Sequence, residues 1–308
     1  MFTGAPLSDA THLEINLPEI TAGGIATVVI IGAGAMGRGI AQVIAEAGLR
    51  AILSDSDSGT LTRAMTGIAA AWDRAVAKGR LDKAFATAAH SNFATDGSLA
   101  AVREADLVIE AIVEKVEAKI DLLRELSPLL RPGAIIGSNT SSISITRLAA
   151  ATDCADRVIG LHFFNPVPVL PLVEVVRGLL TSQDTVGRAI SFARAIGKTP
   201  VEVNDFPGFV SNRVLLPMIN EAIFCLAEGV ASKESIDDIM KLGMAHPLGP
   251  LALADLIGLD VCLDILITLQ RDLGEDKYRP APTLRRLVAA GKLGRKSGEG
   301  FYLYPNHA

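Results

Sequence analysis

Short hydrophobic runs alternate with segments of helical spacing from residue 26 to residue 206. The runs are rich in aliphatic residues and lack polar alternation, which is typical of strands buried in a parallel sheet. We predict strands at 26–31, 50–55, 106–111, 134–138, 157–161, 172–176 and 200–204, and helices at 57–78, 115–130 and 184–196. This alternation predicts an α/β fold with a Rossmann-like doubly wound sheet.

The pattern changes at residues 205–208 (DFPG), after which helical spacing continues almost to the end of the chain. A turn that contains proline and glycine is a typical domain boundary. We predict helices from 209 to 226, from 236 to 242 after the cap Ser232, and from 251 to 269. The chain therefore divides into an extension at 1–24, a Rossmann-like domain at 25–206 and an all-helical C-terminal domain at 207–308.

The composition narrows the class of protein. A length of 308 residues suits about two domains, and a net charge of −5 gives no basic excess for binding nucleic acid. No apolar run approaches the length of a membrane span. Residues 1–24 contain no lysine or arginine, so we expect neither a secretory nor a mitochondrial signal and predict a cytoplasmic protein. The scattered Cys154, Cys225 and Cys262 indicate reduced thiols, and we expect no metal site.

A glycine-rich turn follows the first strand and precedes a helix expected at 36–47. The turn reads Gly32-Ala33-Gly34-Ala35-Met36-Gly37. In this setting Gly32 allows the tight turn, Gly34 lets the backbone approach a pyrophosphate, and Gly37 lets helix and strand pack closely. The N-terminus of the helix then favours the negative charge of the phosphates. The alternative, a turn that binds no nucleotide, is less favoured because strand, turn and helix are all in register.

Asp55 ends the second predicted strand, at the position where a carboxylate binds the adenosine ribose of a dinucleotide. A carboxylate accepts hydrogen bonds from the 2′-hydroxyl and repels a 2′-phosphate. The sequence therefore predicts NAD rather than NADP as the cofactor.

His162 and Glu174 are candidates for acid–base chemistry. His162 follows the strand at 157–161, and Glu174 lies between valines in the strand at 172–176. An ionised acid buried there needs a partner, and twelve residues are enough for the chain to fold back and bring the two together. The alternative is a solvent-facing glutamate and an unrelated core histidine. We prefer the pair because His162 lies at the sheet edge that carries the predicted cofactor.

Two further polar segments allow more than one interpretation. Residues 139–142 (NTSS) follow a strand, and they suit either contacts with a cofactor or helix caps. Arg74, Lys78 and Arg80 form either a solvated basic face or a site for the phosphates of an anionic substrate. The strand at 106–111 is expected to continue to Glu114, at the ligand-binding edge of the sheet.

From about residue 26 to Tyr304 the chain resembles the short-chain L-3-hydroxyacyl-CoA dehydrogenases, which include bacterial 3-hydroxybutyryl-CoA dehydrogenases. The matching motifs are GAGAMGRGIAQ at 32–42, VIEAIVE at 108–114, SNTSS at 138–142, LHFFNPVPV at 161–169, LVEV at 172–175, DFPGFVSNR at 205–213 and GEGFY at 298–302. They occur in the order and at the spacing of the family.

The resemblance implies an acyl-CoA substrate held between an NAD domain and a helical domain that forms a homodimer. It implies that His162 is the catalytic base, that Glu174 orients it, and that Ser141 and Asn212 contact the substrate near its reacting oxygen. The NAD contacts that it implies are the glycine-rich turn, Asp55, Glu114, Lys119, Ser141, Asn165 and Lys296, and the CoA contact is Lys78.

Two positions depart from the family pattern. Ala71 replaces a serine that some relatives place near CoA, and Pro171 replaces a common lysine before the Glu174 strand. The first weakens any inference about CoA affinity, and the second leaves the local strand geometry open. The competing interpretations are a related dehydrogenase of a free hydroxy acid, which would use a helix lysine as its acid–base group, and a non-catalytic NAD-binding protein that resembles the lens λ-crystallins.

Overall fold

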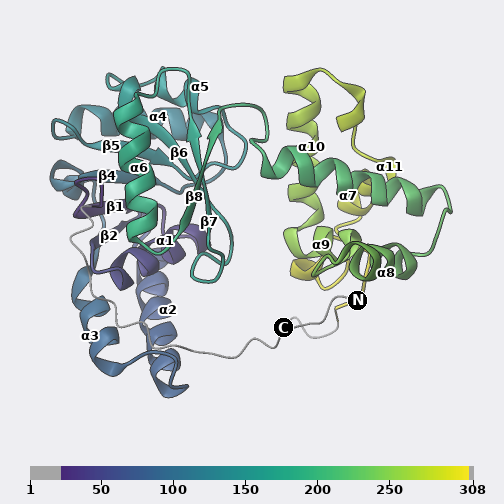
Figure 1. Ribbon diagram of the computed structural model, residues 1–308, viewed down its shortest axis with the longest axis horizontal. Coiled ribbons are helices and arrows are strands. Elements are labelled where there is room, and N and C mark those ends of the chain that lie inside the picture. Colours follow the sequence, from purple (N-terminus) through teal and green to yellow (C-terminus); the bar gives the residue numbers. More distant parts are fainter. Residues whose placement is uncertain (1–21, 305–308) are drawn as a thin grey trace, which may run out of the picture.

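The computed structural model describes residues 22–304, which form one mostly parallel sheet with flanking helices and a separate group of helices (Figure 1). The strands are β1 Thr27–Ile31, β2 Arg50–Ser54, β3 Phe93–Asp96, β4 Leu107–Glu110, β5 Ile135–Ser138, β6 Val158–Phe163, β7 Leu172–Arg177 and β8 Thr199–Asn204. Their order is β3-β2-β1-β4-β5-β6-β7-β8, and β7 runs antiparallel to β6. The first six strands have the doubly wound dinucleotide-binding order, which confirms the predicted fold class.

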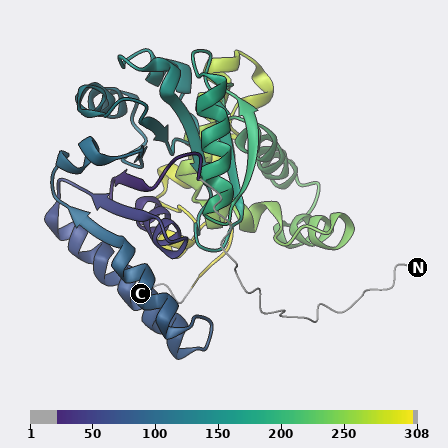
Figure 2. The same cartoon turned by 60° about the vertical axis from the view of Figure 1, so that its left-hand side comes forward.

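Helices cover both faces of the sheet. They are α1 Ala35–Glu46, α2 Ser58–Ala77, α3 Lys83–Asn92, α4 Val116–Leu126, α5 Ile145–Ala149 and α6 Gln183–Ala195. The second view shows α2 and α3 side by side, projecting beyond the sheet (Figure 2). The C-terminal helices are α7 Ser211–Ala227, α8 Lys233–Met244, α9 Pro250–Ile257, α10 Leu259–Leu273 and α11 Pro282–Ala289. The all-helical character of this part, predicted from its spacing, is confirmed.

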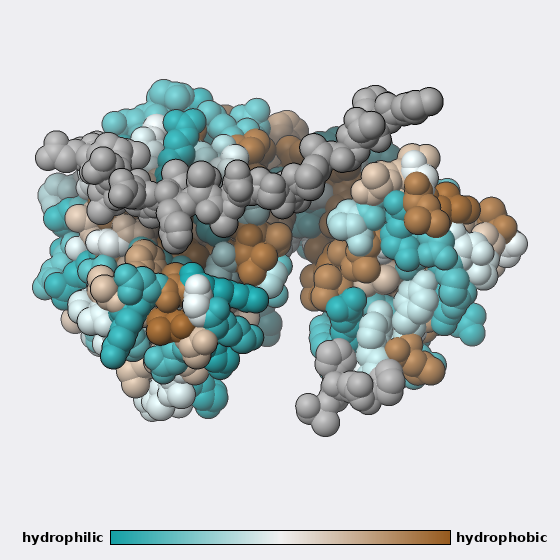
Figure 3. Space-filling model, turned by 60° about the horizontal axis from the view of Figure 1, so that its bottom comes forward, coloured by the Kyte–Doolittle hydropathy of each residue, from teal (hydrophilic) through white to brown (hydrophobic). Residues whose placement is uncertain are grey.

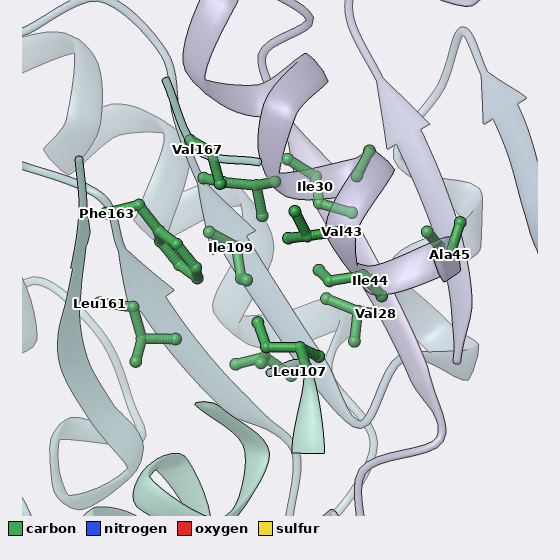
Figure 4. Close-up of a cluster of buried hydrophobic side chains, with 14 of the residues drawn as sticks. Val28, Ile30, Val43, Ile44, Ala45, Leu107, Ile109, Leu161, Phe163 and Val167 are labelled. Atoms are coloured by element: carbon green, nitrogen blue, oxygen red, sulfur yellow. The ribbon is translucent and has the colours of Figure 1, made fainter. Parts of the chain in front are cut away.

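Each part of the chain closes its own hydrophobic core. In the sheet domain, Val28, Ile30 and Ile109 from the central strands pack against Val43 and Ile44 of α1 (Figure 4). The largest core of the helical domain is built from residues 216–301 alone. The burial of β-branched strand residues against an apolar helix stripe is what fixes α1 over β1 and leaves the glycine-rich turn at the sheet edge.

Two predicted elements differ from the structure, and one segment forms elements that were not predicted. The helix expected from 251 to 269 is two helices, because Gly258 adopts a φ of +105° that ends α9 before α10 begins. The strand expected to reach Glu114 ends at Glu110. The segment 83–96, for which no element was predicted, forms α3 and β3. Its alanine-rich helix buries only Ala86 and Ala89, so its apolar stripe is too narrow to recognise from spacing.

Of the predicted extension at 1–24, residues 1–21 lie outside the described residues. The segment between β8 and α7 contains the predicted boundary at 206, where the chain passes from the sheet to the helices.

Candidate active site

The glycine-rich turn joins β1 to α1, and each glycine meets a different steric demand. Gly32 has a φ of +105°, and a Cβ there would lie 2.5 Å from the Ala111 carbonyl oxygen. A Cβ on Gly37 would lie 1.7 Å from the Gly32 oxygen, whereas one on Gly34 would meet no atom within 4 Å. Gly34 therefore borders open space at the start of α1.

The N-terminus of α1 suits an anion. Its cap residue Gly34 offers no side-chain hydrogen bond, and the first turn carries no acid. Backbone N–H groups of the first helical turn therefore have neither a side-chain cap nor an acid within that turn, which is the arrangement that binds a pyrophosphate. The turn and the helix start fit the diphosphate of a dinucleotide.

Asp55 follows β2 and lies beside the turn. Its Oδ2 accepts a hydrogen bond from the Ala33 N–H at 2.8 Å, and its Oδ1 accepts one from the Asp57 N–H at 2.9 Å. These bonds hold the carboxylate against the glycine-rich turn, and each carboxylate oxygen retains further acceptor capacity. The placement fits an adenosine ribose, although that contact stays a prediction.

The open space at Gly34 gives a test of the cofactor site. Gly34→Val is expected to weaken NADH binding about tenfold or more, a loss of about 1.4 kcal/mol, because the side chain would occupy the approach of the pyrophosphate. The fold should persist, since Gly34 has a φ of −66° and its Cβ is free of clashes. Fluorescence titration with NADH measures the effect. Gly187→Val in α6, where an added Cβ is equally unobstructed, is the matched control; equal NADH affinity in the two variants would contradict this placement.

His162 and Glu174 face each other across the antiparallel pair β6 and β7. They are direct partners in the register, and His162 Nδ1 lies 2.8 Å from Glu174 Oε2. His162 is 7% exposed and Glu174 is 3% exposed. The Phe164 and Phe209 rings lie 4.5 Å and 5.9 Å from the imidazole ring, centroid to centroid. Because Nδ1 is held by the carboxylate, Nε2 is the nitrogen that can exchange a proton with a substrate.

The Glu174 carboxylate stays ionised in spite of its burial. Burial raises its pKa, but the hydrogen bonds from His162 and from Ser211 outweigh that effect, so the pKa lies below its usual 4.5. Ser211 donates through its N–H to Oε1 and through its hydroxyl to Oε2, each at 2.9 Å. An ionised carboxylate here is able to stabilise a positive charge on the imidazole ring.

Ser141 and Asn212 also meet at the boundary between the domains. The Asn212 side chain donates to the Ser141 carbonyl oxygen at 2.9 Å. Glu114 Oε1 accepts bonds from the Thr140 hydroxyl at 2.6 Å and from the Ser141 N–H at 2.8 Å. Burial raises the pKa of Glu114, but the Lys119 charge and the Thr140 bond outweigh it, so the pKa is lowered overall. The loop that carries Ser141 is thus held by an ionised carboxylate.

Lys119 lies behind this loop and is only 1% exposed. Its ammonium lies 2.6 Å from Glu110 Oε1 and 3.1 Å from Glu114 Oε2. Glu110 is completely buried and also accepts a bond from the Ser138 hydroxyl at 2.6 Å. Lys119 therefore contacts Glu114, which in turn holds the Ser141 loop. A direct contact between Lys119 and a cofactor stays a prediction.

Three other predicted residues lie on a loop, at a helix end and in the helical domain. Asn165 is exposed in the loop between β6 and β7, and Lys78 is exposed at the end of α2. Lys296 belongs to the helical domain, where its ammonium lies 2.6 Å from Asp260. Their contacts with NAD or CoA stay predictions.

The Pro171 departure leaves β7 intact, because the strand begins at the next residue and pairs along its length with β8.

Two residues of this site were not predicted from the sequence. Glu110 carries the signal of an acid inside an apolar strand, the same signal that identified Glu174. Ser211 carries no such signal, because a serine at the start of a helix is common and its contact with Glu174 depends on how the two domains meet.

The space-filling view shows a hollow between the two lobes, with hydrophobic residues on the sides that face each other (Figure 3). Family models account for nearly the whole described chain. Residues 27–206 match the 3-hydroxyacyl-CoA dehydrogenase, NAD binding domain, and residues 208–304 match the 3-hydroxyacyl-CoA dehydrogenase, C-terminal domain.

The chain belongs to the 3-hydroxyacyl-CoA dehydrogenase family. Its NAD-binding domain makes NAD the cofactor, in agreement with the fit of the turn at Gly34.

Known relatives cover almost the full length of the chain. A probable 3-hydroxybutyryl-CoA dehydrogenase of Bacillus subtilis is 50% identical over 280 residues, which is 91% of this chain and 98% of the relative. The crystal structure of (S)-3-hydroxybutyryl-CoA dehydrogenase PaaH1 from Ralstonia eutropha has a TM-score of 0.89 and 47% identity, covering 92% of this chain and all of that one. A diketoreductase that acts on dicarbonyl compounds is more distant, with a TM-score of 0.79 and 32% identity over 91% of this chain and 99% of that one.

Residues 22–304 contain neither a candidate membrane-spanning helix nor a candidate metal site. No helix in this range has the length and apolar character needed to cross a bilayer. Nor does the range contain three or more histidine, cysteine, aspartate or glutamate side chains grouped so that they could hold a metal ion.

Proposed function

We propose that this protein interconverts (S)-3-hydroxybutyryl-CoA and acetoacetyl-CoA with NAD as cofactor, and that His162 and Glu174 carry the proton transfer. The observation that supports the proposal most directly is the 2.8 Å contact between the His162 and Glu174 side chains at the edge of the nucleotide-binding sheet. The relatives at about half identity bear the name of this activity.

The chemistry requires one proton acceptor. The glycine-rich turn and Asp55 would hold NAD, which would supply the hydride acceptor for C3 of the hydroxyacyl thioester. His162 Nε2 removes the proton from the C3 hydroxyl, and Glu174 holds Nδ1–H and stabilises the imidazolium that forms. In the reducing direction His162 returns the proton to the carbonyl oxygen.

The residues around the pair have positioning and binding roles in this proposal. Ser141 and Asn212, linked at the boundary between the domains, contact the substrate near its reacting oxygen. Lys78 binds the CoA phosphates, and Lys296 reaches NAD from the helical domain. In this proposal the thioester lies in the hollow between the lobes (Figure 3).

A second candidate function is reduction of a dicarbonyl compound without CoA, because the diketoreductase shares the whole fold. The identity of 32% with that protein, against 50% with the 3-hydroxybutyryl-CoA dehydrogenase of Bacillus subtilis, favours the CoA thioester.

The test is the loss of NADH absorbance with acetoacetyl-CoA and with free acetoacetate at the same concentration. The proposal expects turnover with the thioester alone, and faster turnover with NADH than with NADPH because Asp55 disfavours a 2′-phosphate. A chain-length series of 3-ketoacyl-CoA substrates then defines the acyl preference. Equal rates with acetoacetate would favour the second candidate, and NADH binding without any turnover would favour a crystallin-like role.

The proposal includes a cytoplasmic homodimer that associates through the helical domain. Several apolar side chains of this domain are more than half exposed in the single chain, namely Val230, Ile239, Leu242 and Met244. An exposed apolar patch of this kind is typical of a subunit interface. Light scattering should give twice the chain mass of 32.3 kDa, and a monomer mass would contradict the association.

A further inference from the structure

Helix α7 begins against a carboxylate from the other domain. Its cap residue Val210 makes no side-chain hydrogen bond to the helix. Instead, the Glu174 carboxylate, 37 residues earlier on β7, accepts the Ser211 N–H through Oε1 and the Ser211 hydroxyl through Oε2. Glu174 thus takes the part of a helix cap for α7.

Two residues close to Ser211 in the chain, Phe209 and Asn212, also contact the site. Asn212 donates to the Ser141 carbonyl oxygen. Phe209 is buried in a core cluster of the sheet domain with a φ of +49°, and its ring lies 5.9 Å from the His162 ring. A positive φ is costly for a bulky residue and persists only where the surroundings hold it. The start of the helical domain is therefore fixed directly against the catalytic pair.

We propose that Ser211 is a positioning residue for this reaction, whose two donors fix the orientation and charge of Glu174 and, through Glu174, of His162. The inference rests on the function proposed above. It means that the helical domain supplies part of the catalytic apparatus as well as a wall of the substrate hollow.

The physical basis is competition for one carboxylate oxygen. Glu174 Oε2 accepts from His162 Nδ1 and from the Ser211 hydroxyl at once. On the other side of β7 the register partner of Glu174 is the apolar Val201. Among residues 22–304, His162 is the ionisable group that contacts this carboxylate. Removing the hydroxyl leaves more negative charge facing the imidazole, so the imidazolium becomes easier to form and the ring is less firmly oriented.

The test is Ser211→Ala, which removes the hydroxyl and keeps the backbone N–H. The kcat with acetoacetyl-CoA is expected to fall about threefold to tenfold, which corresponds to the net contribution of one ordinary hydrogen bond, because the Ser211 N–H still holds the carboxylate. The affinity of the His162 ring for a proton should rise severalfold. Histidine NMR of the protein without substrate measures that affinity directly, with the His162 signal assigned by its loss in His162→Gln.

Three variants separate positioning from general stability. Ser211→Thr keeps a hydroxyl and should restore most of kcat. Ser232→Ala removes the N-cap hydroxyl of α8, which bonds to Ser235 and not to the pair, and should leave kcat and the His162 titration unchanged. In a Glu174→Gln background, adding Ser211→Ala should change kcat little, because the two act through the same carboxylate.

Two results would overturn the inference. The first is an unchanged His162 titration in Ser211→Ala, and the second is a kcat loss that simply multiplies with that of Glu174→Gln. The comparison of kcat values requires a parent enzyme that turns over acetoacetyl-CoA, whereas the NMR titration does not. A parent that binds NADH but is inactive would refute the proposed function, and the NMR titration would still decide whether Ser211 acts on the pair.

Discussion

Replacement of His162 by glutamine is expected to lower kcat by about a hundredfold or more in both directions, the usual contribution of general acid–base catalysis. Glutamine fills a similar volume between the Phe164 and Phe209 rings but cannot take up a proton. Steady-state kinetics with acetoacetyl-CoA and NADH give the effect.

The binding of NADH distinguishes a catalytic defect from a folding defect. His162 lies on β6, whereas the glycine-rich turn lies between β1 and α1, so the variant should bind NADH with nearly unchanged affinity. Near-normal turnover with intact NADH binding would remove His162 from the mechanism. Loss of both properties would instead indicate misfolding, which circular dichroism and the unfolding transition would reveal.

Replacement of Glu174 by glutamine is expected to have the second-largest effect, again about a hundredfold or more in kcat. The amide group has no charge to stabilise an imidazolium, and its NH₂ can donate to Nδ1 and so favour the wrong tautomer of His162. The KM for acetoacetyl-CoA should change much less than kcat, because Glu174 is 3% exposed and contacts the substrate only through His162 in the proposed mechanism.

The pH dependence of stability gives an independent measurement for the same variant. The pKa of Glu174 is lower in the folded protein than its ordinary value of 4.5. Its contribution to the free energy of unfolding is therefore complete above about pH 4.5 and is lost as the pH falls through the folded pKa. The free energy of unfolding, measured in urea, should fall over this acidic range more for the parent than for Glu174→Gln. Parallel curves for the two proteins would contradict an ionised Glu174 in the native state.

The sequence was sufficient to predict the site wherever a chemical pattern coincided with a strand end. The glycine-rich turn and Asp55 have fixed places in a β-α-β unit, so their positions follow from the alternation of apolar runs. His162 and Glu174 were expected to meet because a buried carboxylate needs a partner, and the structure places them opposite each other in the β6–β7 register. The cofactor and substrate contacts expected for Lys78, Asn165 and Lys296 stay predictions.

The contacts that the sequence did not predict are those that depend on packing between elements. Lys119 and Glu110 are nine residues apart, and nothing in that spacing shows that both side chains turn inward to form a buried ion pair. In the sequence, Gly258 is one small residue within a continuous apolar stripe, and nothing there indicates that its φ of +105° divides the helix in two. Ser211 is informative only after the two domains are placed against each other.

The two separate hydrophobic cores have a consequence for how the protein responds to heat. Because the largest core of each part is built from its own residues, the sheet and the helices can melt as distinct cooperative units, coupled by contacts that include the bonds at Ser211 and Asn212 and the burial of Phe209. Calorimetry should then show two overlapping endotherms, and a ligand that spans the hollow should merge them into one.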